Sequence, residues 1–366
     1  IGAMLGNNTN RYFMNTDVTS VTGTVGNYTV SLRTRPRGVL QCTNCGTCVD
    51  ACPVEVDDAG KMRKAIYYEP TYPDMYAIDF DTCTRCGECV KVCEGKISLD
   101  EKDTNKQIHG GAVVVATGLT WYDVARVQEY GYKRYDGVMT TLEFERAVAS
   151  GRIKPKKIVF IYCAGSRDSK HLLYCSKICC FLGLKEAKLI VDRFPDAQVY
   201  VAAMDMRSSG TFEYLYNKLR ERGVTFIKGK PSEVFQDNGS LIVRTEDLYT
   251  NELLEIDADT VVLSSGFVPD TETFSKLGLR LEHDFPVLFE NAGLGNIELP
   301  RGIFTAGAAT FPAGVRDALI DARKAAFSVL NLLKQEKIEV HQPNAVINDD
   351  LCSVCRMCIG TCPYGA

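Results

Sequence analysis

The cysteines of this 366-residue chain have the number and spacing of metal ligands. All sixteen fall into four groups of four. Three groups follow the spacing C-x2-C-x2-C-x3-C, and the other group follows a different rule. The groups are Cys42, Cys45, Cys48 and Cys52; Cys83, Cys86, Cys89 and Cys93; Cys352, Cys355, Cys358 and Cys362; and Cys163, Cys175, Cys179 and Cys180.

The repeated spacing is typical of cubane iron–sulfur clusters. Three cysteines at intervals of two residues form a tight loop around the iron atoms, and the last thiolate arrives from elsewhere in the chain. In proteins with two such clusters, the last cysteine of each run ligates the cluster of the other run. This rule predicts that Cys93 completes the cluster of the first run and that Cys52 completes the cluster of the second.

Zinc and disulfides are the alternative uses of so many cysteines. Structural zinc sites favour two separated C-x2–4-C pairs over three cysteines in one short loop. Disulfide frameworks are typical of short secreted chains, and this chain is long. We therefore expect about four 4Fe-4S clusters.

The composition narrows the class of protein. Apolar residues make up 45% of the chain, and the 46 acidic residues outnumber the 42 Lys and Arg residues. No stretch approaches the roughly 18 apolar residues that would span a bilayer. There is no basic patch with interleaved aromatic residues, so nucleic acid is not an expected partner. So many thiolates suit a reducing compartment, and we expect a cytoplasmic protein.

The elements around the first two cysteine runs indicate an insertion. Residues 27–33 alternate polar and apolar side chains and predict a strand before the runs. Residues 112–116 form an apolar stretch after them, which predicts a strand buried on both faces. The cysteine-rich segment is therefore interpreted as a small ferredoxin module inserted into a larger domain.

From residue 156 onward the chain alternates between strand and helix patterns. This order predicts a doubly wound parallel sheet with a small antiparallel layer. The predicted strands are 158–162, 199–203, 224–227, 241–245, 252–256 and 260–263, and the predicted helices are 175–188 and 211–222.

The first strand–helix turn of this domain has cysteines where a dinucleotide would usually bind. A pyrophosphate site needs G-x-G-x-x-G, but Cys163 is followed by a segment with a single glycine, Gly165. Helical spacing would put Cys175 and Cys179 on one face, and Cys163 would close the site from the strand end. We interpret the group as a cluster site in place of a nicotinamide cofactor. The alternative is four buried structural cysteines.

Residues 302–309 predict a strand that runs into glycine and alanine before a long helix, residues 315–333. The free N–H groups and the dipole of that helix could receive a flavin pyrophosphate. The alternative is an ordinary strand–turn–helix.

These segments together resemble the A-type iron–sulfur flavoprotein subunit of the heterodisulfide reductase family. The most specific part is 163–168 (CAGSRD) followed by 174–180 (YCSKICC). Other matching segments are 73–79 (PDMYAID), 205–207 (DMR), 246–247 (ED) and 362–366 (CPYGA).

The resemblance implies an α/β, thioredoxin-reductase-like flavoprotein fold with two dinucleotide-binding domains, an inserted ferredoxin domain and the start of a C-terminal one. It implies flavin-domain strands in 1–38, the two-cluster ferredoxin domain in 39–100, a return to the flavin domain in 101–154, a second Rossmann-like domain carrying a cluster in place of NAD in 155–268, the last part of the flavin domain in 269–343 and the start of a second ferredoxin domain in 344–366.

The resemblance also implies an activity. Cys163, Cys175, Cys179 and Cys180 would hold an unusual cluster, and Thr117, Gly118, Gly307 and Ala308 would line FAD. The chain would be an oxidoreductase subunit that works with the other subunits of a heterodisulfide-reductase-type complex. It would distribute electrons from a hydrogenase or formate dehydrogenase partner through FAD to ferredoxin and a heterodisulfide, with electron bifurcation in some members. No Ser/His/Asp or Cys/His constellation is recognisable, so we expect the cofactors to do the chemistry.

The chain departs from the family pattern in three places. We expect it to lack the N-terminal flavin lobe with its G-x-G-x-x-G and the end of the C-terminal ferredoxin domain, which leaves the last ligand of the third run open. In the segment 310–318 (TFPAGVRDA), Ala313 and Gly314 replace the Lys and Asp of bifurcating members. Two alternatives therefore stay open, namely a component of a quinone-interacting membrane-associated oxidoreductase and a flavin-free cluster wire.

Overall fold

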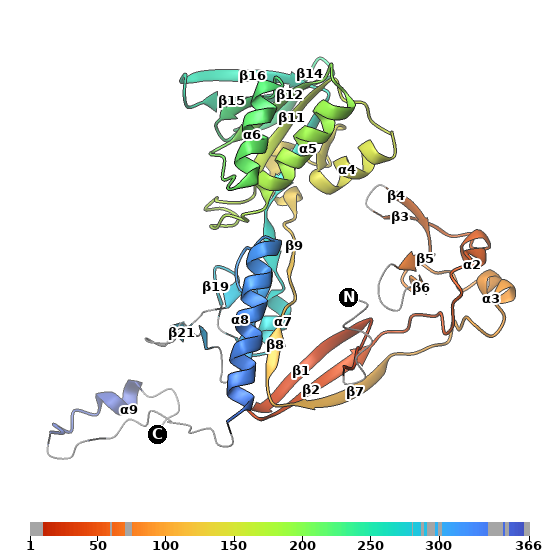
Figure 1. Cartoon of the computed structure of the whole chain (residues 1–366), viewed down its shortest axis with the longest axis vertical. Helices are drawn as coiled ribbons and strands as arrows, with labels where there is room; N and C mark the ends of the chain where they lie inside the picture. Colours follow the sequence, from red (N-terminus) through yellow and green to blue (C-terminus); the bar gives the residue numbers. More distant parts are fainter. Residues whose placement is uncertain are drawn as a thin grey trace.

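The structure is a computed structural model that describes residues 10–58, 61–69, 75–279, 281–286, 289–290, 297–298, 302–335, 347 and 351–361. Figure 1 shows an α/β domain around helices α4 to α6, a slender part along helix α8, and a small cysteine-rich part around α2 and α3. Each part is described below for what it contributes to the candidate sites.

The α/β domain is built on a parallel sheet whose central strand is β11 (Lys157–Ala164). From Ile158 to Ala164 every residue of β11 is buried, as expected for a strand covered on both faces. Its parallel neighbours on the two sides are β17 (Thr260–Ser265) and β12 (Gln198–Ala203). The outer strands are β10 (Val138–Thr140) and β13 (Thr225–Lys228).

Helices cover one face of this sheet, and a second sheet covers the other. Helices α4 (Thr141–Ala149), α5 (Cys179–Arg193) and α6 (Thr211–Glu221) share a hydrophobic core with Phe160 and Val201 of the sheet. The opposite core joins the sheet to an antiparallel layer through residues such as Ile161 and Val243. That layer consists of β14 (Glu233–Asp237), β15 (Ser240–Asp247) and β16 (Glu252–Ala258).

The predicted helix 175–188 begins later than expected. Helix α5 starts at Cys179, so Cys175 lies in the preceding loop. Lys177 has a φ of 62°, which is incompatible with a right-handed helix. The Ser176 hydroxyl, which is fully buried, accepts a hydrogen bond from the Phe267 amide at 2.9 Å and therefore fixes this loop against β18 (Phe267–Pro269).

The slender part contains two parallel strands, β8 (Val113–Val115) and β23 (Ile303–Thr305). The prediction that the first strand is buried on both faces is wrong, because Val114 is 45% exposed. Helix α8 spans Val315–Leu333, as predicted, but apolar residues on it such as Val315, Leu319 and Leu330 are largely exposed. Its buried residues include Asp321.

The remaining elements of this region are short. Strand β9 (Leu119–Trp121) pairs antiparallel with β18. The other elements are the 3-10 helices η1 (Val124–Arg126), η2 (Gln128–Tyr130) and η3 (Gly307–Ala309), the helix α7 (Thr271–Lys276) and the two-residue strands β19 (Leu281–Glu282), β20 (Phe285–Pro286), β21 (Phe289–Glu290) and β22 (Ile297–Glu298).

The cysteine-rich part is carried on an antiparallel sheet. Strand β2 (Asn27–Thr34) pairs with β1 (Thr16–Thr24) on one side and with β7 (Thr104–Gly110) on the other. At the neck of the insertion, the Glu101 carboxylate accepts hydrogen bonds from the amides of Arg37 and Gly38 at 3.0 and 2.7 Å. These bonds hold the entering and leaving chain segments together.

The insertion and the third cysteine run contain only short elements among the described residues. They are α2 (Thr47–Asp50), β3 (Glu55–Asp58), β4 (Lys61–Lys64), β5 (Ile66–Glu69), β6 (Met75–Ile78), α3 (Glu88–Val92) and α9 (Met357–Thr361). Among the residues that the structure describes, no helix combines the length and the apolarity needed to cross a membrane.

Candidate metal centres

The first two cysteine runs surround two cavities, and each cavity takes cysteines from both runs. Cys93 of the second run joins the first run at one cavity, and Cys52 of the first run joins the second run at the other. The first cavity is lined by Cys42, Cys45, Cys48 and Cys93, and the second by Cys52, Cys83, Cys86 and Cys89. The structure thus brings together both crossed ligand sets, and their binding of clusters stays a prediction.

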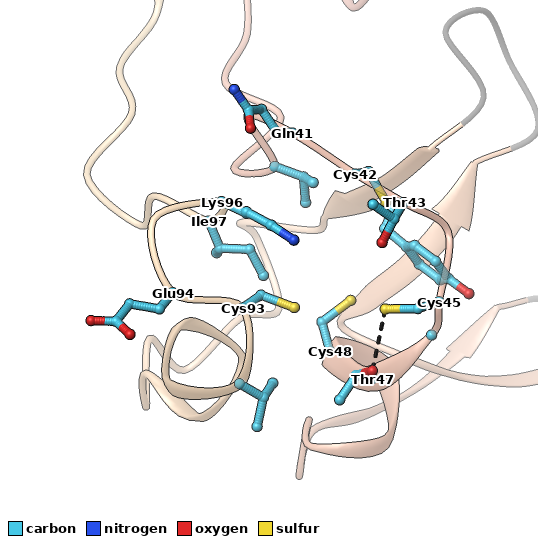
Figure 2. Close-up of a pocket in the computed structure, with 14 residues that line it drawn as sticks. Gln41, Cys42, Thr43, Cys45, Thr47, Cys48, Cys93, Glu94, Lys96 and Ile97 are labelled. Carbon is cyan, nitrogen blue, oxygen red and sulfur yellow. Dashed lines mark hydrogen bonds between the residues drawn. The ribbon is translucent and has the colours of Figure 1, made fainter.

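The thiols at the first cavity are close enough to influence one another. Figure 2 shows the sulfurs of Cys45, Cys48 and Cys93 directed toward a common space. Burial, followed by the charges of Cys93 and Cys42, raises the pKa of Cys48 to about 12. An iron core would relieve this crowding, because iron binds the thiolate form and its positive charge offsets the repulsion. The donor set therefore fits a cluster.

Hydrogen bonds within the loop act in the opposite direction on Cys45. Thr47 Oγ1 lies 3.2 Å from Cys45 Sγ (Figure 2). Hydrogen bonds from the Thr47 side chain and backbone are the main causes that lower the pKa of Cys45 to about 7. Within the described residues, no three His, Cys, Asp or Glu side chains are grouped as a single metal ion would need.

All three ferredoxin-type runs have the same backbone conformation. The second residue after the first cysteine has a positive φ of 56° in each run, at Asn44, Arg85 and Val354. In the first two runs its amide donates a hydrogen bond to that cysteine's sulfur, at 3.3 and 3.4 Å. The third cysteine of each run lies in a short helix, α2, α3 or α9. The third run therefore shares these local backbone features with the two runs of the insertion, and its binding of a cluster stays a prediction.

The described cysteines of this third run are all exposed, whereas the insertion also has buried cysteines, Cys48, Cys52 and Cys89. Cys352, Cys355 and Cys358 all face solvent, and Cys362 lies outside the described residues. Hydrogen bonds from the Met357 backbone and the Ser353 side chain lower the pKa of Cys355.

A further group of cysteines lies between β11 and α5, and we call Cys163, Cys175, Cys179 and Cys180 the β11–α5 site. Cys163, Cys179 and Cys180 are 2 to 3% exposed, and Cys163 Sγ lies 3.9 Å from Cys179 Sγ. The hydrogen bond between these two thiols is the main cause that lowers the pKa of Cys163 and raises that of Cys179. Cys163 lies near the end of β11 with a φ of 58°, a conformation that non-glycine residues adopt rarely.

Cys175 lies in the loop before α5 and not in the helix. The expectation that Cys175 and Cys179 share a helical face is wrong, because α5 begins at Cys179. The loop instead repeats the geometry of the ferredoxin-type runs. Lys177, two residues after Cys175, has a positive φ, and its amide donates to Cys175 Sγ at 3.3 Å. This local likeness supports Cys175 as a ligand.

Sequence reasoning missed the polar residues that hold this loop. Ser166 and Ser176 are fully buried, and their hydroxyl oxygens lie 2.9 Å apart. Arg167 forms a two-pronged ion pair with Asp205, which the sequence analysis recognised only as part of a family segment. The sequence signal for this pair was that Arg167 lies in the family segment 163–168 (CAGSRD) and Asp205 in the family segment 205–207 (DMR). Only the fold shows that the two segments are in contact.

The four residues predicted to line FAD lie at one edge of a small parallel sheet. Thr117 and Gly118 follow the carboxyl end of β8, and Gly307 and Ala308 follow that of β23. The two ends are adjacent, because the Ala306 amide donates to the Val115 carbonyl at 2.9 Å. Such edges are where α/β proteins bind ligands.

The turn at Gly307 is fixed from helix α8. The Gly307 amide and the Thr310 hydroxyl both donate to Asp321 Oδ2 at 2.8 Å. Gly307 has a φ of 66°, which a residue with a side chain would adopt only with strain. The Gly307 amide is thus occupied by Asp321, and the space where a side chain would begin is next to Ala318 of α8. The assignment of these residues to FAD stays a prediction.

Comparisons with known proteins show what the chain is similar to. The chain is 38% identical to a CoB–CoM heterodisulfide reductase iron–sulfur subunit, of type A, from Methanopyrus kandleri, over 96% of this chain and 58% of that protein. It is 38% identical to the corresponding protein of Methanocaldococcus jannaschii, with the same coverage of both chains. The chain is a homologue of the A-type iron–sulfur subunits of CoB–CoM heterodisulfide reductases. The resemblance found in the sequence is therefore confirmed.

A third relative is the A-type subunit of the "H(2)/formate:CoB-CoM heterodisulfide,ferredoxin reductase" of Methanococcus maripaludis. It is 37% identical to this chain, over 96% of this chain and 58% of that protein. The chain thus spans about 58% of the length of each of these relatives. Residues 41–97 match the family model described as "4Fe-4S dicluster domain". The predicted α/β fold class with an inserted iron–sulfur domain is confirmed.

Among solved structures, T. acidophilum thioredoxin reductase matches with a TM-score of 0.43 and 18% identity, over 64% of this chain and 68% of that chain.

Proposed function

We propose that the chain is part of an electron-transfer oxidoreductase subunit in a heterodisulfide-reductase-type complex. In this proposal, electrons pass through FAD and several 4Fe-4S clusters, and the protein positions these cofactors and sets their potentials. The observation that carries the proposal is the β11–α5 site, where cysteines replace the phosphate loop of a dinucleotide-binding domain. A nicotinamide-dependent reductase would need that loop.

The cofactor roles follow from the groups of residues described above. The crossed cysteine sets of the insertion would hold two clusters, and the β11–α5 site and the third run would hold one each. Thr117, Gly118, Gly307 and Ala308 would contact FAD, which exchanges electrons as pairs or singly and can therefore connect two-electron donors to one-electron clusters. The side chains themselves need not donate or accept protons at a reacting atom.

The donor and the acceptors belong to the same proposal. We infer that a hydrogenase or formate dehydrogenase delivers electrons and that ferredoxin and a heterodisulfide receive them, with bifurcation at the flavin. Support comes from the name of the Methanococcus maripaludis relative, which includes H(2), formate, ferredoxin and the heterodisulfide. The segment next to α8, with Ala313 and Gly314, bears on how the flavin is tuned and therefore on bifurcation.

The test is anaerobic quantification of iron, sulfide and flavin in the purified complex, with EPR spectra at successive stages of reduction. The proposal expects about four clusters and one FAD for each copy of this chain. Clusters without flavin would contradict it and leave the flavin-free wire. Copurification with a membrane-anchored cytochrome, and reduction of quinone in place of ferredoxin, would favour the quinone-interacting alternative.

A further inference from the structure

We propose that Arg167, held by Asp205, raises the reduction potential of the cluster at the β11–α5 site. This inference rests on the proposed function, because it requires a cluster at these four cysteines. It goes beyond that function because it gives Arg167 and Asp205, which are not cluster ligands, a role in setting the reduction potential.

The backbone of Arg167 is fixed between two of the cysteines. The Ser166 amide donates to the Cys163 carbonyl at 3.0 Å, and the Arg167 amide donates to the Tyr174 carbonyl at 3.1 Å. Arg167 therefore follows one cysteine and is tied to the residue that precedes Cys175. Its φ of 55° is rare for a residue with a long side chain, so the surrounding loop must hold it there.

The side chain is fixed as firmly as the backbone. Nη1 and Nη2 of Arg167 donate to Oδ1 and Oδ2 of Asp205 at 2.5 and 3.1 Å. Such two-pronged pairs restrict the orientation of the guanidinium group. Arg207 Nε also donates to Asp205, at 3.3 Å. Two guanidinium groups thus share one carboxylate, which leaves a surplus of positive charge beside the site.

The position of the guanidinium group follows from the fold. Asp205 comes just after β12, which pairs in parallel with β11, the strand that carries Cys163. The Arg167 backbone is tied to the loop between Cys163 and Cys175, and its side chain reaches Asp205 beside that strand end. The guanidinium group therefore lies on the cysteine side of the sheet edge.

The other charged groups near the site are largely balanced. The Lys177 ammonium is paired with Asp317 of α8 at 2.5 Å, and Asp168 is paired with Lys230. Glu186 is fully buried in α5, and its pKa is raised to about 9, so it is neutral at pH 7. The charge surplus therefore stays with the arginines around Asp205.

The effect on the cluster follows from charge. Reduction adds one electron, and therefore one negative charge, to the cluster and its thiolates. A fixed positive charge nearby stabilises the reduced form more than the oxidised form and raises the potential. The Arg167 side chain is 22% exposed, so water and salt screen this interaction only in part. Asp205 opposes the effect while it orients the arginine.

The test is a redox titration of the intact chain, monitored by EPR. It compares a variant that loses a positive charge with one that loses a negative charge. Cys179→Ser identifies the signal of this cluster by its loss. In Arg167→Met, at a fixed solution potential, we expect the ratio of reduced to oxidised cluster to fall about tenfold, which corresponds to about 59 mV for one electron. Asp205→Asn should shift the ratio the other way, and Arg167→Lys should stay close to the wild type.

Arg244→Met is the matched control. Arg244 pairs with Glu233 and Glu255 on the antiparallel sheet, and its loss should leave the potential unchanged. The signals of the clusters in the insertion should also stay constant in every variant.

The outcomes separate this inference from the proposed function. Wild-type protein without a cluster at the β11–α5 site, judged from iron content and the Cys179→Ser comparison, would refute the cluster assignment itself. A cluster that is present but keeps its potential in both Arg167→Met and Asp205→Asn would overturn the electrostatic role alone. If Arg167→Met loses the cluster, Asp205→Asn decides, and an unchanged potential in that variant overturns the inference.

Discussion

Cys48 of the first cysteine run and Cys93 of the second line the same cavity, and the charge of Cys93 affects Cys48 more than that of Cys42 does. Cys42 belongs to the same run as Cys48, so the closer electrostatic relationship is the one between runs. This is the arrangement expected if each run supplies its last cysteine to the neighbouring cluster.

The crossed arrangement predicts which pairs of substitutions act together. Cys93→Ser and Cys45→Ser should each cost about one cluster, and the double variant should lose no more iron than either single variant. Cys93→Ser combined with Cys86→Ser should lose about two clusters, because these cysteines would belong to different ones. Iron and sulfide content of anaerobically purified protein measures both. The opposite pattern would mean that each run binds its own cluster.

The buried hydroxyl of Ser176 should stabilise the α/β domain and retain the cluster of the β11–α5 site. It accepts from the Phe267 amide and lies against Ser166. Ser176→Ala leaves that amide buried without its partner, which typically costs about 1 to 3 kcal/mol. Anaerobic denaturant unfolding should show the loss, and iron release from this site should become faster.

Ser275→Ala provides the comparison for that substitution. The Ser275 hydroxyl donates to a carbonyl within α7 and is exposed. We expect a change of less than about 0.5 kcal/mol in the free energy of unfolding. Equal effects of the two substitutions would contradict a special role for Ser176.

The sequence predicted the parts of the sites that depend on local spacing. The cysteine runs specify their loops within a few residues, and β11, β12 and α6 follow from apolar periodicity. The start of α5 could not be predicted in this way. The loop with the positive φ of Lys177 is held by a hydrogen bond from the Phe267 amide to Ser176, and Phe267 lies far along the chain. Local helix propensity cannot predict such a long-range contact.

The exposure of β8 and α8 was equally inaccessible to sequence reasoning. Apolar residues such as Val114 and Leu319 predict burial, but the pattern does not reveal which face is covered. The pairing of Arg167 with Asp205 depends on the parallel register of β11 and β12, which brings their carboxyl ends together.

Glu186 makes the stability of the α/β domain depend on pH. Burial, and secondarily the Glu145 carboxylate, raises the pKa of Glu186 to about 9, well above the value of about 4.3 in an unfolded chain. Between these pH values the folded state binds more protons than the unfolded state. The contribution of Glu186 to the free energy of unfolding is therefore complete below pH 4 and is lost as the pH rises toward 9. The slope is at most about 1.4 kcal/mol per pH unit.

Glu186→Gln should remove this slope, because the amide keeps the shape and stays neutral. Anaerobic denaturant unfolding at pH 6 and pH 8 should show a smaller decrease in the variant than in the wild type. Glu145→Gln is the control, since this carboxylate pairs with Lys185 and is partly exposed. It should keep most of the slope. Parallel pH profiles for wild type and Glu186→Gln would show that the carboxyl is already ionised in the folded protein.

The backbone of the third run offers a test of whether it is a cluster loop. Val354 is 73% exposed and has a φ of 56°, which for a β-branched residue costs roughly 1 to 2 kcal/mol. Val354→Gly relieves this strain without loss of packing, so iron should be retained longer against a chelator. Val354→Pro fixes φ near −65° and should remove about one cluster. Leu351→Gly, at an exposed neighbouring position, controls for added flexibility and should not slow iron loss. Full iron content in Val354→Pro would mean that this conformation serves no cluster.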